Sequence, residues 1–252
     1  MPIVAAAGRA THVQELGAGP AVVMIHGLLI GSLASWYFTA APQLARGHRV
    51  RVYDLRGHGR SERAASGYDT RTLAGDLDAV TADLREPFDL VGHSWGGLVA
   101  LRYAIEHPAR VRRLAIVEAP LPPSSALQMA SFLADDGQLP ARLLDALPAP
   151  LREAVASGRR QAERLMKSLE LLVLESSLLA DVRNEPDLAD AELARVGTPA
   201  LLLYGDSSAC APGGERLARA LPAARHVVLP GGHYLHLDAR DALARELEEF
   251  LA

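Results

Sequence analysis

The most constraining feature of the sequence is a short motif in which an apolar run ends in Gly-x-Ser-x-Gly. Residues 88–91 have the composition of a buried strand, Gly92-His93-Ser94-Trp95-Gly96 follows directly, and apolar positions at helical spacing begin at Leu98. Glycines on both sides of Ser94 let neighbouring backbones pass where a side chain would clash. The motif therefore predicts a strand, a sharp strained turn and a helix, with the Ser94 hydroxyl exposed at the end of the strand.

The predicted turn places Ser94 beside the free N–H groups and the positive dipole end of a helix, which favours a serine that gains negative charge. We interpret Ser94 as a nucleophile. The alternative is a dinucleotide-binding loop, because Gly92, Gly97 and a later Glu118 loosely resemble that fingerprint. Ser94, however, stands where the second glycine must let the backbone approach a pyrophosphate, and several predicted strands precede it.

The hydrophobic pattern predicts a parallel α/β sheet with helices on both faces, because apolar strand-like runs alternate with helical periodicity. The expected strands are Ile3–Ala6, Thr11–Leu16, Ala21–Ile25, Arg49–Tyr53, Phe88–Val91, Leu114–Val117, Ala200–Tyr204 and Val227–Leu229. The expected helices are Ser35–Arg46, Thr70–Leu84 with Thr72 as N-cap, roughly 159–181, Gly214–Leu221 and Asp241–Leu251.

The pattern changes between residues 121 and 192, where helical stretches are divided by Pro140, Pro148 and Pro150. We interpret residues 121–192 as a helical cap over the carboxyl edge of the sheet, and residues 1–120 and 193–252 as the α/β core. An ordinary helical bundle that completes the core is the alternative.

The bulk properties fit one large α/β domain and exclude several classes of partner. The 252 residues are 49% hydrophobic, with a formal net charge of −4. This negative net charge does not indicate binding to nucleic acid or to an anionic membrane. The single Cys210 excludes an internal disulfide and suits a reducing compartment. Residues 1–7 have no basic n-region, and no apolar stretch is long enough to span a bilayer. We expect a cytoplasmic protein.

Taken together, four segments resemble the α/β-hydrolase superfamily, and the resemblance covers essentially the whole chain. They are His26-Gly27 after a strand, Asp54-Leu55-Arg56-Gly57-His58-Gly59-Arg60-Ser61, the motif around Ser94, and Gly231-Gly232-His233. The resemblance implies an eight-stranded, mostly parallel sheet with a cap inserted after the sixth strand. It also implies a Ser-His-acid triad with His233 as the base that takes the proton of Ser94.

The acid of the triad departs from the usual pattern of the family. The common position, Gly-x-x-Asp after the seventh strand, reads Gly205-Asp206-Ser207-Ser208, and a serine cannot stabilise an imidazolium as a carboxylate can. Some members of the superfamily carry the acid after the preceding strand, where this chain has Glu118. We favour Glu118 and keep Asp206 as the alternative acid; a Glu118 that only binds loop amides is the structural alternative.

The resemblance also implies an oxyanion hole formed by the backbone N–H groups of Trp95 and Leu28. We expect the substrate pocket to be lined by residues from the core and the cap, namely His26, Trp36, Met129, Phe132 and His236. No metal-ligand spacing or phosphate loop is present, so we expect no cofactor.

With serine as the nucleophile, the expected reaction is hydrolysis of an ester, thioester or lactone of an apolar, medium-sized acyl group through an acyl-enzyme. An aspartate in place of Ser94 would have indicated haloalkane or epoxide chemistry. A carbon–carbon bond hydrolase, a serine-dependent lyase or cyclase, and a non-catalytic ligand-binding protein of the same fold are the alternatives. The expected partner is a small acyl substrate.

Overall fold

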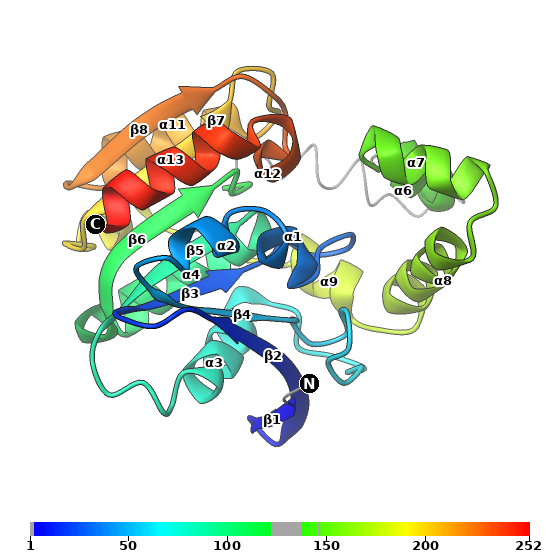
Figure 1. The fold of residues 1–252 in the computed structure, drawn as a ribbon, viewed down its shortest axis with the longest axis horizontal. Coiled ribbons are helices and arrows are strands. Elements are labelled where there is room, and N and C mark those ends of the chain that lie inside the picture. Colours follow the sequence, from blue (N-terminus) through cyan, green and yellow to red (C-terminus); the bar gives the residue numbers. More distant parts are fainter. Residues whose placement is uncertain (1–2, 122–137, 146) are drawn as a thin grey trace.

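The computed structural model describes residues 3–121, 138–145 and 147–252, and an eight-stranded sheet runs through it (Figure 1). The strands are ordered β1-β2-β4-β3-β5-β6-β7-β8. The first two pairings, β1 with β2 and β2 with β4, are antiparallel, and all the others are parallel. The strands are β1 Ile3–Ala6, β2 Arg9–Leu16, β3 Ala21–Ile25, β4 Arg49–Tyr53, β5 Phe88–His93, β6 Val111–Val117, β7 Ala200–Gly205 and β8 Ala224–Leu229.

Helices cover both faces of this sheet, as the alternating pattern predicted; α13 lies in front of it in Figure 1 and α11 behind it. The helices of the core are α1 Ala34–Tyr37, α2 Ala41–Leu44, α3 Thr70–Val80, α4 Trp95–Glu106, the 3₁₀ turn Pro108–Arg110, α11 Ala211–Ala220, α12 Leu235–Asp238 and α13 Arg240–Leu251. Those between β6 and β7 are α6 Leu139–Asp145, α7 Ala149–Ala156, α8 Arg160–Leu174, α9 Leu178–Arg183 and α10 Asp190–Leu193.

Two apolar cores, one on each face of the sheet, fix its register because side chains alternate along each strand. On β3, Val23 and Ile25 face the core that includes Leu98 of α4, whereas Val22 and Met24 face the core that includes Leu247 of α13. A shift of β3 by one residue would exchange these faces. The central strands therefore end at fixed positions, and the loops that follow them start from a rigid edge.

Two of the predicted helices are interrupted, and the N-cap of a third helix is a different residue from the one predicted. The helix expected over 35–46 is divided into α1 and α2, and Pro42 stands in the first turn of α2, where its missing N–H costs nothing. The stretch expected over 159–181 is broken after Leu174 into α8 and α9. Thr72 is not the N-cap of α3, because the side chain of Asp69 accepts the Thr72 N–H at 2.8 Å and fills that role.

The segment between β6 and β7 is anchored to the core through α9 and the loop that follows it. The N–H groups of Gly67 and Tyr68 donate to Asp181 Oδ2 at 3.2 and 2.8 Å, and the Thr70 N–H donates to Glu185 Oε2 at 2.9 Å. In Figure 1, α6, α7 and α8 lie apart from the sheet, on the side toward which the arrowheads of β6 and β8 point.

Among the residues that the structure describes, no helix combines the length and the apolar character needed to cross a membrane.

Candidate active site

Ser94 occupies a strained turn between β5 and α4. Its φ of 54° and ψ of −127° lie outside the regions that side-chain-bearing residues usually adopt. The neighbouring elements enforce this conformation, since the Ser94 N–H donates to the Val117 carbonyl of β6 at 2.8 Å and the Gly97 N–H donates to the Ser94 carbonyl at 2.8 Å. The strand, sharp turn and helix predicted from the sequence are present.

The glycines of the motif are required by close backbone approaches. A Cβ on Gly96 would lie 2.5 Å from the His26 carbonyl oxygen, and a Cβ on Gly92 would overlap the Gly96 carbonyl oxygen. A Cβ on Gly27 would lie 2.8 Å from the Ser94 Cβ. The loop after β3 therefore runs directly against the serine.

His233 reaches Ser94 from the loop after β8. Its Nε2 lies 3.0 Å from Ser94 Oγ, and its side chain is 33% exposed. The backbone of His233 is held in place by His93, whose Nε2–H donates to the His233 carbonyl at 2.8 Å. His93 thus positions the loop that carries His233, a function that the sequence did not reveal.

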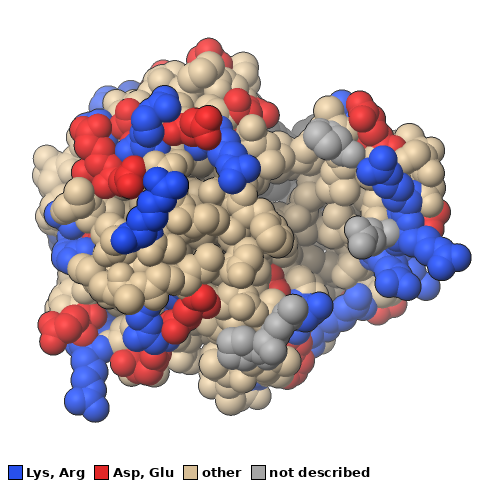
Figure 2. Space-filling model, in the orientation of Figure 1, with Lys and Arg blue, Asp and Glu red and all other residues tan. Residues whose placement is uncertain are grey.

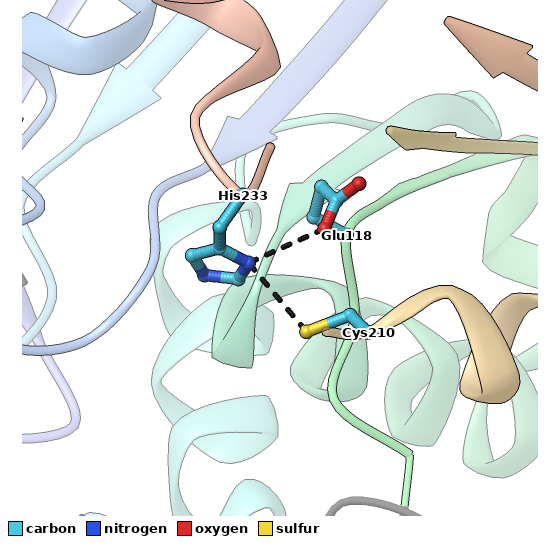
Figure 3. A group of neighbouring side chains, drawn as sticks. All are labelled: Glu118, Cys210 and His233. Carbon is cyan, nitrogen blue, oxygen red and sulfur yellow. Dashed lines mark hydrogen bonds and ion pairs between the residues drawn. The ribbon is translucent and has the colours of Figure 1, made fainter. Parts of the chain in front are cut away.

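Glu118 lies on the far side of the His233 ring, fully buried, at the end of β6 (Figure 3). Its Oε2 is 3.3 Å from His233 Nδ1, the nitrogen that faces away from Ser94. The Gly205 N–H donates to Oε1 and the Ser208 hydroxyl donates to Oε2, so the carboxylate is fixed from two sides. Glu118 itself has a φ of 58°, a conformation that the surrounding contacts must maintain.

The alternative acid, Asp206, points elsewhere. It is exposed, and its Oδ1 accepts the Gly231 N–H at 3.0 Å, which braces the turn before His233. Ser208, which stands at the common position of the acid, is instead a donor to Glu118. The geometry thus brings Ser94, His233 and Glu118 together, whereas Asp206 does not contact the His233 ring.

A third side chain contacts the His233 ring. Cys210 Sγ lies 3.5 Å from His233 Nδ1, next to the Glu118 carboxylate (Figure 3). Burial of His233 lowers the pKa of its imidazole, but hydrogen bonds and charge interactions with Cys210 and Glu118 outweigh burial and raise that pKa from 6.5 to about 9. Cys210 lies two residues after Ser208, and its pairing with a residue of another loop left no trace in the spacing of the sequence.

The loop after β3 is braced by two buried, neutral histidines. His26 Nδ1–H donates to the Gly27 carbonyl at 2.7 Å, while its Nε2 accepts the Leu55 N–H at 2.9 Å. His58 Nε2 accepts the Leu29 N–H at 3.0 Å, and its Nδ1–H donates to the Arg56 carbonyl at 2.8 Å. Burial lowers the pKa of both rings, to about 3 for His58, so each keeps one nitrogen free to accept.

Several residues expected to line the substrate pocket serve the core instead. His26 is fully buried, with both ring nitrogens bonded to backbone, and Trp36 is fully buried, with its Nε1–H donating to the Ile25 carbonyl at 2.9 Å. His236 is 6% exposed and packs against Trp36 and His93. The prediction that these three residues line the substrate pocket is therefore wrong, because the structure buries all three rings. Met129 and Phe132 lie outside the described residues.

The comparison with known proteins places the chain in a family. The model of the α/β-hydrolase fold matches residues 20–164. The chain is also 33% identical to the pimeloyl-[acyl-carrier protein] methyl ester esterase of Chromobacterium violaceum, in an alignment that covers 95% of this chain and 97% of that protein. The chain belongs to the α/β-hydrolase fold family. It is thus an enzyme of this family, and the predicted fold class is confirmed.

Two further proteins are similar to the chain, one in part of its sequence and one in its fold. The chain is 42% identical over 119 residues to the 2-hydroxymuconate semialdehyde hydrolase of Pseudomonas sp. (strain CF600), and this alignment spans 44% of the chain but only 41% of that relative. The crystal structure of the enol-lactonase from Burkholderia xenovorans LB400 superposes with a TM-score of 0.76 at 24% identity, over 99% of both chains. The latter supports the fold alone.

Because His58 is buried in its neutral form, we expect the folded protein to lose stability at acid pH. Its folded pKa of about 3 lies below the ordinary 6.5, so between these values the unfolded chain binds the additional proton and stability falls as the pH falls. Each such histidine contributes a slope of up to about 1.4 kcal/mol per pH unit. Urea unfolding of the wild type and His58→Gln between about pH 7 and about pH 4 should give a shallower slope for the variant. Equal slopes would contradict the prediction.

The raised pKa of His233 leads us to expect a particular pH dependence of kcat/KM. A general base must be unprotonated, so kcat/KM should increase with pH through a midpoint near the folded pKa of about 9 and not near 6.5. Cys210→Ala removes one of the two contacts that raise the pKa and should move the midpoint toward neutrality. A wild-type midpoint near 6.5, unchanged in the variant, would refute this assignment.

Proposed function

We propose that this enzyme is a serine hydrolase that cleaves an ester, thioester or lactone of an apolar, medium-sized acyl group through an acyl-enzyme. The observation that carries the proposal is the continuous arrangement of three groups: Ser94 Oγ lies 3.0 Å from His233 Nε2, and His233 Nδ1 lies 3.3 Å from Glu118 Oε2. These contacts are of the length and order that activate a serine hydroxyl.

In the proposed mechanism His233 Nε2 takes the proton of Ser94 while Oγ attacks the substrate carbonyl. Glu118 holds Nδ1–H and stabilises the imidazolium that forms. The tetrahedral intermediate then collapses, and His233 returns the proton to the leaving alcohol or thiol. Water attacks the acyl-Ser94 ester with the same base, which releases the carboxylic acid and restores the serine.

Two backbone N–H groups are available to bind the oxyanion of this intermediate. Trp95 is the first residue of α4 and directly follows Ser94, and Leu28 follows Gly27, which abuts the serine. Neither N–H donates a hydrogen bond to any residue within the described part of the chain, whereas the Leu29 N–H is occupied by His58. We therefore assign the oxyanion hole to Trp95 and Leu28.

The comparisons favour an ester-type bond over a carbon–carbon bond. The relative named as a methyl ester esterase aligns across almost the whole chain, whereas the similarity to the semialdehyde hydrolase covers less than half of it. The apolar character of the acyl group is supported by Leu28 and Leu29, which are partly buried and directly follow Gly27, the residue that abuts Ser94. Figure 2 shows a hollow between the body of the molecule and the lobe of α6–α8, and the surface of the body beside it is mostly uncharged.

Ser94→Ala tests the nucleophile. The variant should fold normally but lose nearly all turnover of ester, thioester and lactone substrates, because binding and the oxyanion hole alone leave only residual acceleration. A fluorophosphonate probe should label the wild type and not the variant. Ser157→Ala, which changes an exposed serine at the end of α7, is the matched control. Retention of activity within about tenfold of wild type would remove Ser94 from the mechanism.

Glu118→Gln compared with Asp206→Asn tests the acid, since both changes neutralise a charge and nearly preserve shape. Glu118→Gln should lower kcat by about 10³–10⁴-fold, the scale seen when a triad acid is neutralised and the histidine loses its tautomer. Asp206→Asn should cost far less, since Asp206 contacts the Gly231 turn and not the His233 ring. The opposite ranking in steady-state kinetics would transfer the role to Asp206.

A further inference from the structure

Three side chains with metal-ligand chemistry converge behind the imidazole of His233. The carboxylate of Glu118, the thiol of Cys210 and Nδ1 of His233 lie so that their ligand atoms are all within 4.8 Å of one another (Figure 3). They come from three different loops, after β6, between β7 and α11, and after β8. The proposed mechanism uses the glutamate and the histidine but has no role for the thiol.

The two separations measured from His233 Nδ1 match those of a tetrahedral zinc site. Zinc binds nitrogen, oxygen and sulfur at about 2.0–2.3 Å, and at tetrahedral angles these bonds place N and O about 3.3 Å apart and N and S about 3.5 Å apart. The observed distances from His233 Nδ1 are 3.3 Å to Glu118 Oε2 and 3.5 Å to Cys210 Sγ. These two separations need no change, whereas the ligand atoms of Glu118 and Cys210, which lie within 4.8 Å of each other, must come to about 3.6 Å for a tetrahedral site. A rotation of the Cys210 side chain can supply that movement.

The ligands are also held by neighbouring groups, as in metal sites with an ordered outer shell. Ser208 links two of them, because its hydroxyl donates to Glu118 Oε2 and its oxygen accepts the Cys210 N–H at 3.0 Å. The Gly205 N–H fixes the other carboxylate oxygen, Oε1. Cys210 and His233 are both partly exposed, so solvent can deliver an ion and fill its fourth position.

We propose that Glu118, Cys210 and His233 form a site for Zn²⁺ or a similar thiophilic divalent cation, and that occupancy of this site inhibits the enzyme. On binding, the Cys210 thiol and the Nδ1–H of the protonated His233 ring each lose a proton to solvent, and the resulting neutral imidazole coordinates through Nδ1, which leaves the remaining ring proton on Nε2. A protonated Nε2 cannot accept the proton of Ser94. The inhibition rests on the proposed function, whereas the binding does not.

The binding is tested without reference to activity, on metal-free wild type and on Ser94→Ala. Co²⁺ is the spectroscopic probe, because a cysteine ligand gives a thiolate-to-metal charge-transfer absorption in the near ultraviolet. Both proteins should bind one Co²⁺ per chain with that absorption, and Zn²⁺ should displace it. Zn²⁺ should also protect the single Cys210 from a thiol-reactive reagent. A Co²⁺ spectrum without the thiolate band would overturn the site.

Cys210→Ser tests the ligand set, with Ser207→Ala as a control on the same loop. Loss of an outer-shell partner typically weakens metal binding by 10–100-fold, so loss of the thiolate should weaken Zn²⁺ binding by at least about 100-fold, while Ser207→Ala stays close to wild type. If Cys210→Ser does not fold, Cys210→Ala and the thiol-protection assay on wild type give the same answer. Equal Zn²⁺ affinity in wild type and Cys210→Ser would refute the proposal.

Inhibition is measured as the Zn²⁺ dependence of ester hydrolysis, with each variant normalised to its own metal-free rate. Wild type should lose activity over the concentration range in which Co²⁺ and Zn²⁺ compete, and a chelator should restore it; Cys210→Ser should need at least about 100-fold more Zn²⁺. A full thiolate band with unchanged turnover would overturn the inhibitory role. Absence of hydrolysis in metal-free wild type would contradict the proposed function, and the Co²⁺ spectra would still decide the site.

Discussion

The site depends on one carboxylate, Glu118, being held in a conformation that the backbone alone disfavours. Its φ of 58° turns the chain at the end of β6, and hydrogen bonds from Gly205 and Ser208 of the neighbouring loop fix both oxygens. The same strand fixes the nucleophile, because the Val117 carbonyl accepts the Ser94 N–H. Two consecutive residues at the end of β6 thus set the positions of both ends of the Ser94–His233–Glu118 chain.

A triad acid must place a carboxylate next to His233 Nδ1. Which strand carries that carboxylate matters less. With Glu118 after β6 as the proposed acid, the common position after β7 no longer has to carry a charge. Ser208 at that position contributes a hydroxyl to Glu118, and Asp206 braces the turn before His233. A second carboxylate at Ser208 would face Glu118 directly, and two like charges at that distance repel. The serine is therefore compatible with Glu118 in a way that an aspartate would not be.

The parts of the structure that follow from local chemistry could be predicted from the sequence. Alternating apolar runs indicated the sheet, and Gly92 and Gly96 indicated the turn at Ser94. Ser208 at the common position of the acid left Glu118 and Asp206 open, and the family resemblance favoured Glu118, which the structure places beside His233. What depends on contacts between distant segments could not. Cys210 meets His233 only because α11 begins beside the loop after β8. The burial of His26, Trp36 and His236, which the pocket predictions did not anticipate, likewise depends on tertiary packing.

The placement of Cys210 gives the site two properties with a common cause. Both the thiol and the Glu118 carboxylate present electron-rich atoms to the single Nδ1–H of His233, which cannot point at both. This arrangement stabilises a proton on the ring, which raises the pKa of His233 to about 9. In the proposed metal site, a divalent cation replaces that proton and binds all three ligand atoms at once. The contacts that raise the pKa of His233 are therefore the same contacts on which the proposed metal site rests, and a smaller or apolar residue in place of Cys210 would lower that pKa and weaken the proposed metal binding together.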